Sequence, residues 1–268
     1  MASPSRTIAT KRTPMDSMRR TALVAGILYL LTFASSIPAA LLLGNTLGNP
    51  DYILGAGADG QVRLAALFDI VNGLTAIGTA VALFSVLKRQ HEGLAIGFVA
   101  SRLFEAAILF IGIVSVMSIA TLRETGAAAA DPASLVAVGH ALTTLYQVAF
   151  TLGTGIPALN AFLLGWLLFR SGLVPRAIPV LGLIGAPLFT SWIVGYIFGI
   201  TEGGTLWHAI GVAPIFFWEL SLGLWMTFKG FRKDAPLMVE AAAETASPDG
   251  SPSVAYTSIG AVSKAGAA

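Results

Sequence analysis

The sequence contains no cysteine, and only 11% of its residues are charged. Without cysteine the chain has no disulfide, thiol nucleophile or thiolate metal ligand, and its redox compartment stays open. Soluble domains carry about 25% charged residues, so a fraction this low is typical of a membrane protein. The formal net charge of +2 gives no indication of nucleic-acid binding.

Apolar runs long enough to cross a bilayer, for which about 20 residues suffice, recur along the chain. We therefore predict an all-α polytopic membrane protein, a bundle of six transmembrane helices over residues 19–232. Tails rich in small and polar residues flank it at 1–18 and 233–268, and we expect both to be disordered. The predicted helices cover residues 22–43, 64–87, 94–121, 144–169, 177–200 and 205–228.

The first apolar run follows Arg19 and Arg20, which is also the pattern of a secretory signal peptide. The apolar part of such a peptide is usually only about 7–15 residues long. This run is longer, and further apolar runs follow it. An uncleaved first helix is therefore the favoured interpretation, and a signal peptide is the alternative.

Residues 134–169 form a run that is too long for one simple crossing. The pair Asp131-Pro132 fits a helix that begins near Ser134. We expect an interfacial or outward first portion, whose role the sequence leaves open, and then a crossing over 144–169. Gly153, Gly155 and Pro157 predict a kink or break within this crossing, because proline removes a backbone donor and clashes with the preceding turn.

The positions of lysine and arginine predict the orientation. With six crossings both termini lie on one side of the membrane, and the positive-inside rule places the basic side in the cytoplasm. We therefore expect both termini in the cytoplasm of a bacterium, with the bundle in the inner membrane. Twelve basic residues then lie inside and only Arg63 and Arg123 outside; the twelve are Arg6, Lys11, Arg12, Arg19, Arg20, Lys88, Arg89, Arg170, Arg176, Lys229, Arg232 and Lys233.

Several short segments together resemble a known family of bacterial integral-membrane proteins, domain of unknown function 4386. The resemblance covers roughly residues 18–232 and implies a six-helix membrane protein. The family has no established activity, so the resemblance implies no catalytic residues. The segments that carry it are residues 19–29 (RRTALVAGILY), 49–52 (NPDY), Asn72 with 78–80 (GTA), 87–93 (LKRQHEG), 170–176 (RSGLVPR) and 218–223 (WELSLG).

Ionisable residues inside the apolar runs mark the candidate site, because charge within a bilayer is costly and faces a partner or a cavity. Arg102 and Glu105 are three residues apart, so they share one face of the third helix. At about 1.5 Å per residue, Arg102 and Glu219 lie at a similar depth. We expect Arg102 to neutralise one carboxylate, leaving the other to bind a proton. Asp69, near the outer surface, and Asn72 complete the candidate binding residues.

Three functional hypotheses follow. The first is a small-solute or proton-coupled binding and transport protein centred on Arg102, Glu105 and Glu219. The second is a structural or regulatory membrane protein whose charges only lock the bundle, since polar contacts join helices in membranes. The third is a membrane-embedded enzyme that acts on a lipid, which is disfavoured because the sequence has no P-loop, H-E-x-x-H or G-x-S-x-G motif.

We predict no catalytic residue, no metal site and no cofactor. The expected surroundings are the lipid bilayer and a small solute or proton as ligand, without nucleic acid. Homo-oligomer formation, the identity of the ligand and the coupling ion stay open.

Overall fold

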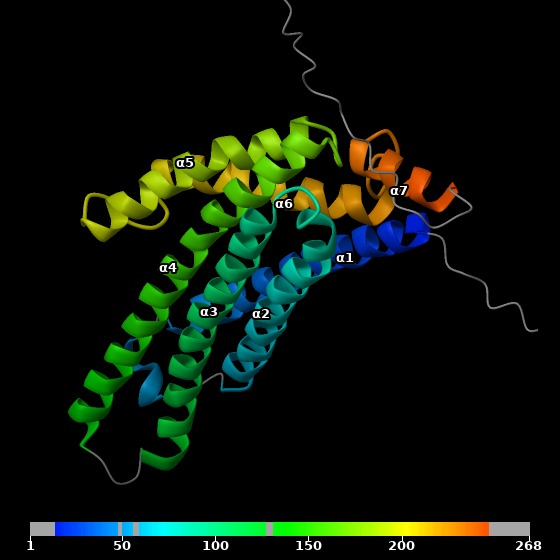
Figure 1. Cartoon of the computed structure of the whole chain (residues 1–268). Coiled ribbons are helices and arrows are strands. Elements are labelled where there is room, and N and C mark those ends of the chain that lie inside the picture. Colours follow the sequence, from blue (N-terminus) through cyan, green and yellow to red (C-terminus); the bar gives the residue numbers. More distant parts are fainter. Residues whose placement is uncertain (1–13, 48–49, 56–58, 127–130, 247–268) are drawn as a thin grey trace, which may run out of the picture.

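The computed structural model describes residues 14–47, 50–55, 59–126 and 131–246. Six long α-helices dominate it, and a 3-10 turn and one short helix complete the described elements (Figure 1). These are α1 (Pro14–Leu47), η1 (Pro50–Ile53), α2 (Asp59–Leu87), α3 (Glu92–Gly126), α4 (Pro132–Ser171), α5 (Ala177–Ile197), α6 (Leu206–Phe228) and α7 (Pro236–Ala246). The predicted all-α class with six long apolar helices is confirmed.

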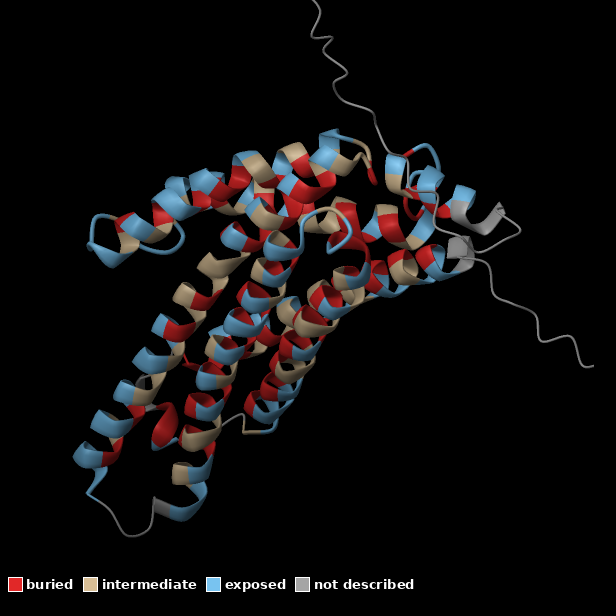
Figure 2. Cartoon of the chain, in the orientation of Figure 1, coloured by how far each residue is buried: buried red, intermediate tan, exposed pale blue. Residues whose placement is uncertain are grey.

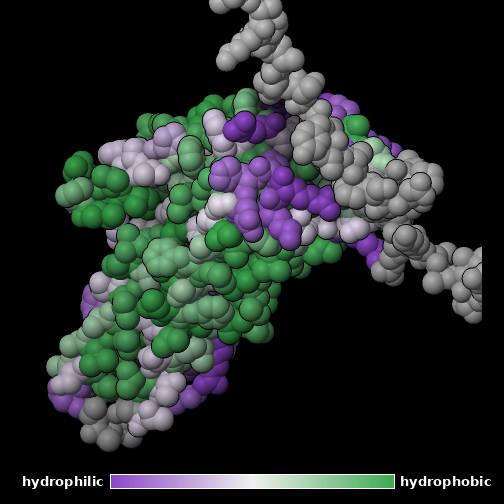
Figure 3. All heavy atoms as spheres, in the orientation of Figure 1, coloured by the Kyte–Doolittle hydropathy of each residue, from purple (hydrophilic) through white to green (hydrophobic). Residues whose placement is uncertain are grey.

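Each of the helices α1 to α6 is long and apolar enough to cross a membrane. Large hydrophobic side chains remain exposed along their outer faces, among them Leu41, Val81, Val114 and Phe217. Figure 2 shows buried and exposed positions alternating along each helix, and Figure 3 shows the hydrophobic surface that results. Exposed apolar surface on this scale is favourable against lipid and costly in water.

The six helices pack as a closed ring. Each helix contacts the next one in the chain, and α6 closes the ring against α1. The helices α2, α3 and α4 lie side by side, and α5 and α6 cross them near one end (Figure 1). Consequently α3 and α6 occupy opposite positions in the ring, and only long side chains can join them across its interior.

Small residues allow the closest helix contacts in the ring. A Cβ atom on Gly26 of α1 would lie 2.5 Å from the backbone nitrogen of Thr227 in α6, and one on Gly182 of α5 would lie 2.8 Å from the indole of Trp218. Any larger residue would force the helices apart, so these glycines set how tightly α6 packs against its two neighbours.

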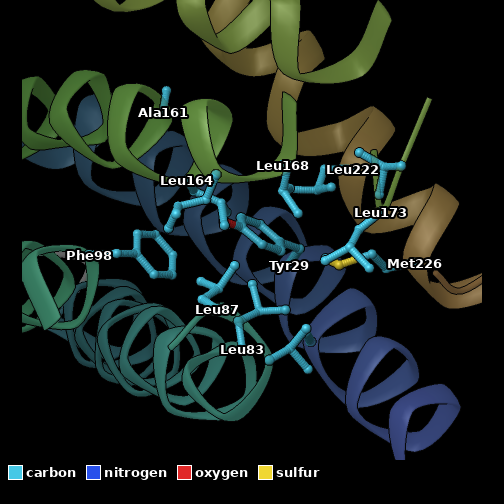
Figure 4. Close-up of a cluster of buried hydrophobic side chains, with 14 of the residues drawn as sticks. Tyr29, Leu83, Leu87, Phe98, Ala161, Leu164, Leu168, Leu173, Leu222 and Met226 are labelled. Carbon is cyan, nitrogen blue, oxygen red and sulfur yellow. The ribbon is translucent and has the colours of Figure 1, made fainter. Parts of the chain in front are cut away.

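Two buried hydrophobic clusters fill the ring. The larger cluster draws side chains from all six long helices and from α7. Figure 4 shows its centre, where Tyr29, Leu83, Leu87, Phe98, Ala161, Leu164, Leu168, Leu173, Leu222 and Met226 converge. The smaller cluster packs Tyr52 and Ile53 of η1 against the ends of α1, α2 and α3. The larger cluster borders the polar site described below, because the Tyr29 and Phe98 ring centres lie 5.3 Å and 5.8 Å from the guanidinium carbon of Arg102.

Helix α4 differs from the crossing predicted over 144–169, because it is one continuous helix from Pro132 to Ser171. Its start agrees with the one expected near Ser134, because the Asp131 side chain caps the helix by accepting a hydrogen bond from the Ser134 backbone N–H at 3.1 Å. The glycines that predicted a break serve packing instead. A Cβ on Gly153 would lie 3.2 Å from Ile108 of α3, and one on Gly155 would lie 2.8 Å from Ile193 of α5.

The two predicted tails are shorter in the structure than the sequence indicates. Helix α1 already begins at Pro14, since Met18 is buried in the larger cluster. At the other end, α7 lies within the predicted tail and packs against α1. Burial of Met238 and Ala241 provides its apolar anchor. The rest of the predicted tails, residues 1–13 and 247–268, lies outside the described residues.

Candidate functional site

A central charge cluster of Arg102, Glu105 and Glu219 lies inside the ring. Arg102 and Glu105 are one turn apart on α3, and the distance from Arg102 Nη1 to Glu105 Oε2 is 3.0 Å. From the opposite position in the ring, α6 contributes Glu219, whose Oε1 lies 2.8 Å from Arg102 Nη2. The structure thus brings together the three charged residues predicted for the site.

Arg102 contacts both carboxylates, whereas we expected it to neutralise only one of them. The planar guanidinium presents several N–H groups in different directions, so Arg102 donates to both glutamates at once. The Arg102 side chain is only 2% exposed, and those of Glu105 and Glu219 are 10% and 12% exposed. One cation therefore faces two nearly buried carboxylates.

Three uncharged side chains that were not predicted as site residues complete the cluster. The Tyr29 hydroxyl of α1 accepts from Arg102 Nη2 at 3.1 Å, and its ring centre lies 5.3 Å from the guanidinium carbon. Asn160 Nδ2 of α4 donates to Glu105 Oε2 at 2.7 Å. Ser101 donates to the Asn160 side-chain oxygen. The network therefore joins α1, α3, α4 and α6.

Helical depth could have indicated Asn160. It lies nine residues from the predicted end of its crossing at Phe169, as Glu219 does from Phe228. At about 1.5 Å per residue, both side chains fall at one level. An amide at the depth of buried charges is a natural hydrogen-bond partner, whereas nothing comparable in the sequence distinguishes Tyr29 or Ser101 from other apolar or small helix residues.

A pocket of about 250 Å³ opens beside the cluster, and we call it the Glu105 pocket. Glu105 is the point of contact, since it belongs to the cluster and to the pocket wall. Asn72 of α2, predicted as a binding residue, lines the same pocket. Helices α1 to α4 supply the wall, which consists of Ser36, Ile37, Ala40, Asn72, Glu105, Leu109, Phe150, Gly153, Thr154 and Pro157.

Asp69 takes no part in the cluster or in the wall of the Glu105 pocket. It lies one turn before Asn72 on α2 and is only 4% exposed, although the sequence places it near the outer surface. Tyr146 of α4, a residue within the predicted crossing, lies within electrostatic range of the Asp69 carboxylate, which places Asp69 on an inner face of α2. Within the described part of the chain, the Asp69 side chain makes no hydrogen bond or ion pair.

A second polar group, which we call the loop cluster, consists of Tyr52, Asp59 and Arg123. Arg123 Nε lies 3.0 Å from Asp59 Oδ1, and the Arg123 guanidinium carbon lies 4.1 Å from the Tyr52 ring centre. Arg123 also donates to the backbone oxygens of Tyr52 and Gly55. The Tyr52 hydroxyl donates to Asp59 Oδ1 at 2.7 Å. Burial raises the pKa of Tyr52, and the bond to Asp59 adds to this effect.

Six membrane-length apolar helices around a buried charge cluster define an α-helical, multi-pass membrane protein. The family model described as Domain of unknown function (DUF4386) matches residues 24–230. The chain therefore belongs to this family, as the resemblance predicted. Neither the comparison with curated proteins nor the comparison with solved structures found a match.

Proposed function

We propose that this membrane protein binds a small solute or a proton in the Glu105 pocket, and that this binding is a step in transporting the solute or proton across the membrane. The observation that carries the proposal is that Glu105 belongs both to the central charge cluster and to the wall of the pocket. This carboxylate lines a pocket large enough for a small molecule and is also bonded to the buried arginine. A change at the pocket can therefore act on the contacts that join α3, α4 and α6.

Polar atoms in the pocket wall are available for a ligand. Arg102 and Asn160 both donate to Glu105 Oε2. Glu105 Oε1 has no hydrogen-bond partner among the described residues, and neither does the Asn72 side-chain amide. Both residues are largely buried, and their free polar atoms gain from a hydrogen-bond partner. A solute that donates to Glu105 and exchanges hydrogen bonds with Asn72 would satisfy both groups.

The charge balance favours a proton or a positively charged group over an anion. Two carboxylates share one guanidinium, so the cluster carries an excess negative charge when both are ionised. A proton on Glu105, or a cationic group in the pocket, would compensate that charge in surroundings where charge is poorly solvated.

Native mass spectrometry of the gently solubilised chain tests the proposal. We expect a small molecule to accompany wild type and to be lost from folded Glu105→Gln and Asn72→Ala. The matched control is Glu124→Gln, which removes an exposed carboxylate that does not line the pocket. For the proton, infrared difference spectra between acidic and neutral pH should contain a carboxyl band that disappears in Glu105→Gln. If both variants retain wild-type ligand content and the same infrared band, the proposal is wrong.

A structural role is the second candidate, and one observation favours it. The Arg102–Glu219 ion pair links α3 and α6, which lie opposite each other in the ring. In this alternative the charges only fix the arrangement of helices. Variants of Arg102 would then lose stability, while the ligand content of every folded variant would equal that of wild type.

We further propose that the protein lies in a bacterial inner membrane with both termini in the cytoplasm. The unequal division of basic residues supports this orientation. Because the chain has no cysteine, single cysteines can report it directly. With a membrane-impermeant thiol reagent on intact bacteria, Thr125→Cys should be labelled and Lys229→Cys should not. The reverse labelling would place the termini outside.

A further inference from the structure

Two adjoining pockets lie at the end of the bundle where α2 meets α3 and α4 meets α5. Their volumes are about 440 Å³ and 450 Å³, and they share Arg170, Ser171 and Pro236. We call the two together the arginine cleft. The first is lined by Arg89, Gln90, His91, Leu94, Trp166, Leu167, Arg170, Ser171, Pro236 and Leu237, and the second by Arg170, Ser171, Gly172, Pro175, Arg176, Arg232, Asp234, Ala235 and Pro236.

Positive charge is concentrated in the cleft and is largely uncompensated. Four arginines line it, namely Arg89, Arg170, Arg176 and Arg232. Among the lining residues the only carboxylate is Asp234, which Arg232 engages at 3.0 Å. The side chains of Arg89 and Arg170 make no hydrogen bond or ion pair with any described residue. An anion is the ligand that these free guanidinium groups fit, above all a phosphate group.

A further donor and an apolar side complete the cleft. Gln90 Nε2 is buried and has no hydrogen-bond partner in the described part of the chain. Leu94, Leu167 and Leu237 supply apolar surface next to the charges, and the half-exposed Trp166 faces outward at the same level. Exposed tryptophan is typical of the membrane–water interface. The cleft thus combines phosphate donors with an apolar wall and a half-exposed tryptophan.

Basic turns exposed to water would satisfy the positive-inside rule without binding any ligand. Two features distinguish the arginine cleft from such turns. First, the chain after α6 closes over it, since the Arg232 backbone N–H donates to Leu173 O at 2.9 Å and α7 contributes Pro236 and Leu237. Second, the arginines come from three separate segments and share adjoining hollows. Figure 3 shows hydrophilic residues gathered over the α2–α3 turn, beside the hydrophobic surface of the helices.

We propose that the arginine cleft binds the phosphate headgroup of an anionic phospholipid from the leaflet at this end of the bundle. Arg89 and Arg170 hold the phosphate, Gln90 donates to it, and the leucines contact the glycerol and upper acyl region. Basic pockets between membrane helices bind acidic headgroups in this way. The site is separate from the Glu105 pocket, and its test does not depend on that proposal.

Native mass spectrometry of the full chain in detergent, titrated with phosphatidylglycerol or with phosphatidylcholine, tests the inference. We expect preferential binding of phosphatidylglycerol, and a loss of about 25-fold in its affinity in the double variant Arg89→Gln/Arg170→Gln, about fivefold for each arginine. The matched control is Lys229→Gln/Lys233→Gln, which removes the same charge from the same end but lines neither pocket. We expect the control to lose distinctly less affinity than the cleft variant, because neither lysine lines the site of the headgroup.

Each result bears on the proposal. Equal losses in the two double variants would indicate nonspecific attraction to basic turns and would overturn it, as would equal binding of the two lipids. Excess inorganic phosphate at constant ionic strength distinguishes the source. If phosphate alone binds and displaces the lipid, the cleft takes soluble phosphate and the lipid assignment is wrong. Both double variants alter exposed side chains without described partners, so their thermal unfolding should match that of wild type.

Discussion

Helix α3 carries two arginines that the fold uses in different ways, Arg102 inside the ring and Arg123 near the end of the helix. Each guanidinium lies close to a tyrosine ring and pairs with a carboxylate. Arg102 faces two carboxylates that are at most 12% exposed. Arg123 faces one, Asp59, which is 31% exposed, and its two Nη groups each donate to a backbone oxygen.

The difference lies in charge balance and surroundings. The loop cluster is neutral, since one cation meets one carboxylate, and its contacts hold η1 against the helices. The central charge cluster has a surplus carboxylate and adjoins a pocket. A purely structural ion pair needs only one partner on each side, so the surplus carboxylate is the reason for proposing ligand binding at the Arg102 cluster and only loop attachment at Arg123.

Replacing Arg102 should have the largest effect. Arg102→Leu leaves Glu105 and Glu219 inside the ring without a cation, and removing one partner of a buried ion pair costs about 3–5 kcal/mol. We expect the free energy of unfolding in mixed micelles to fall by that amount. Circular dichroism during titration with denaturing detergent measures it.

The control for Arg102→Leu adds Glu105→Gln and Glu219→Gln in the same chain. This triple variant contains no uncompensated charge in the cluster, so most of the lost stability should return. A triple variant as unstable as Arg102→Leu would mean that packing of the Arg102 stem against Tyr29 and Phe98 matters more than its charge.

Arg123→Gln should have a smaller effect, because Asp59 can then be solvated. The variant loses hydrogen bonds from a charged group to two backbone oxygens, for a cost of about 1–3 kcal/mol. We expect faster hydrogen exchange at the amides of Tyr52 and Ile53, with little change inside the ring. Uniformly faster exchange along α3 would contradict the assignment of Arg123 to loop attachment.

Raising the pH should loosen the loop cluster as well. The pKa of Tyr52 is raised on folding, so the folded chain holds the phenol proton more tightly than the unfolded chain. Its contribution to stability is complete below the ordinary tyrosine pKa of about 10 and is lost as the pH rises above that value. Hydrogen exchange at Ile53 should accelerate above about pH 10 in wild type. Tyr52→Phe removes the ionising group, so the same pH step should have less effect there.

The sequence predicts the elements of this fold well, because hydropathy alone identifies six crossings and depth along each helix brings Arg102 and Glu219 to one level. It does not predict which helices are neighbours. The position of Asn160 beside Glu105 depends on how α4 packs against α3. The burial of Asp69 depends on which face of α2 is turned toward the other helices, and hydropathy along α2 does not give that face.

The loop cluster was harder to predict for a related reason. From the sequence, Arg123 is predicted only as a basic residue outside the membrane, because topology rules count charges without regard to their partners. Its carboxylate, Asp59, precedes it by 64 residues and lies on a different helix, and η1 is too short to give a periodic signal. Long-range contacts of this kind appear only when the helix ends are placed in space.

Arg63→Gln should have the smallest effect on stability. It tests whether the burial of each ion pair determines how much stability its arginine variant loses. Arg63 pairs with Glu124 close to the loop cluster, but their side chains are 49% and 52% exposed. Water screens such a pair, which stabilises a fold by less than about 1 kcal/mol. We expect the free energy of unfolding of Arg63→Gln to lie within about 1 kcal/mol of the wild-type value and to change little with salt. If Arg63→Gln destabilised the chain as much as Arg123→Gln, exposure would not separate the two pairs, and the contrast between Arg102 and Arg123 would need a cause other than burial.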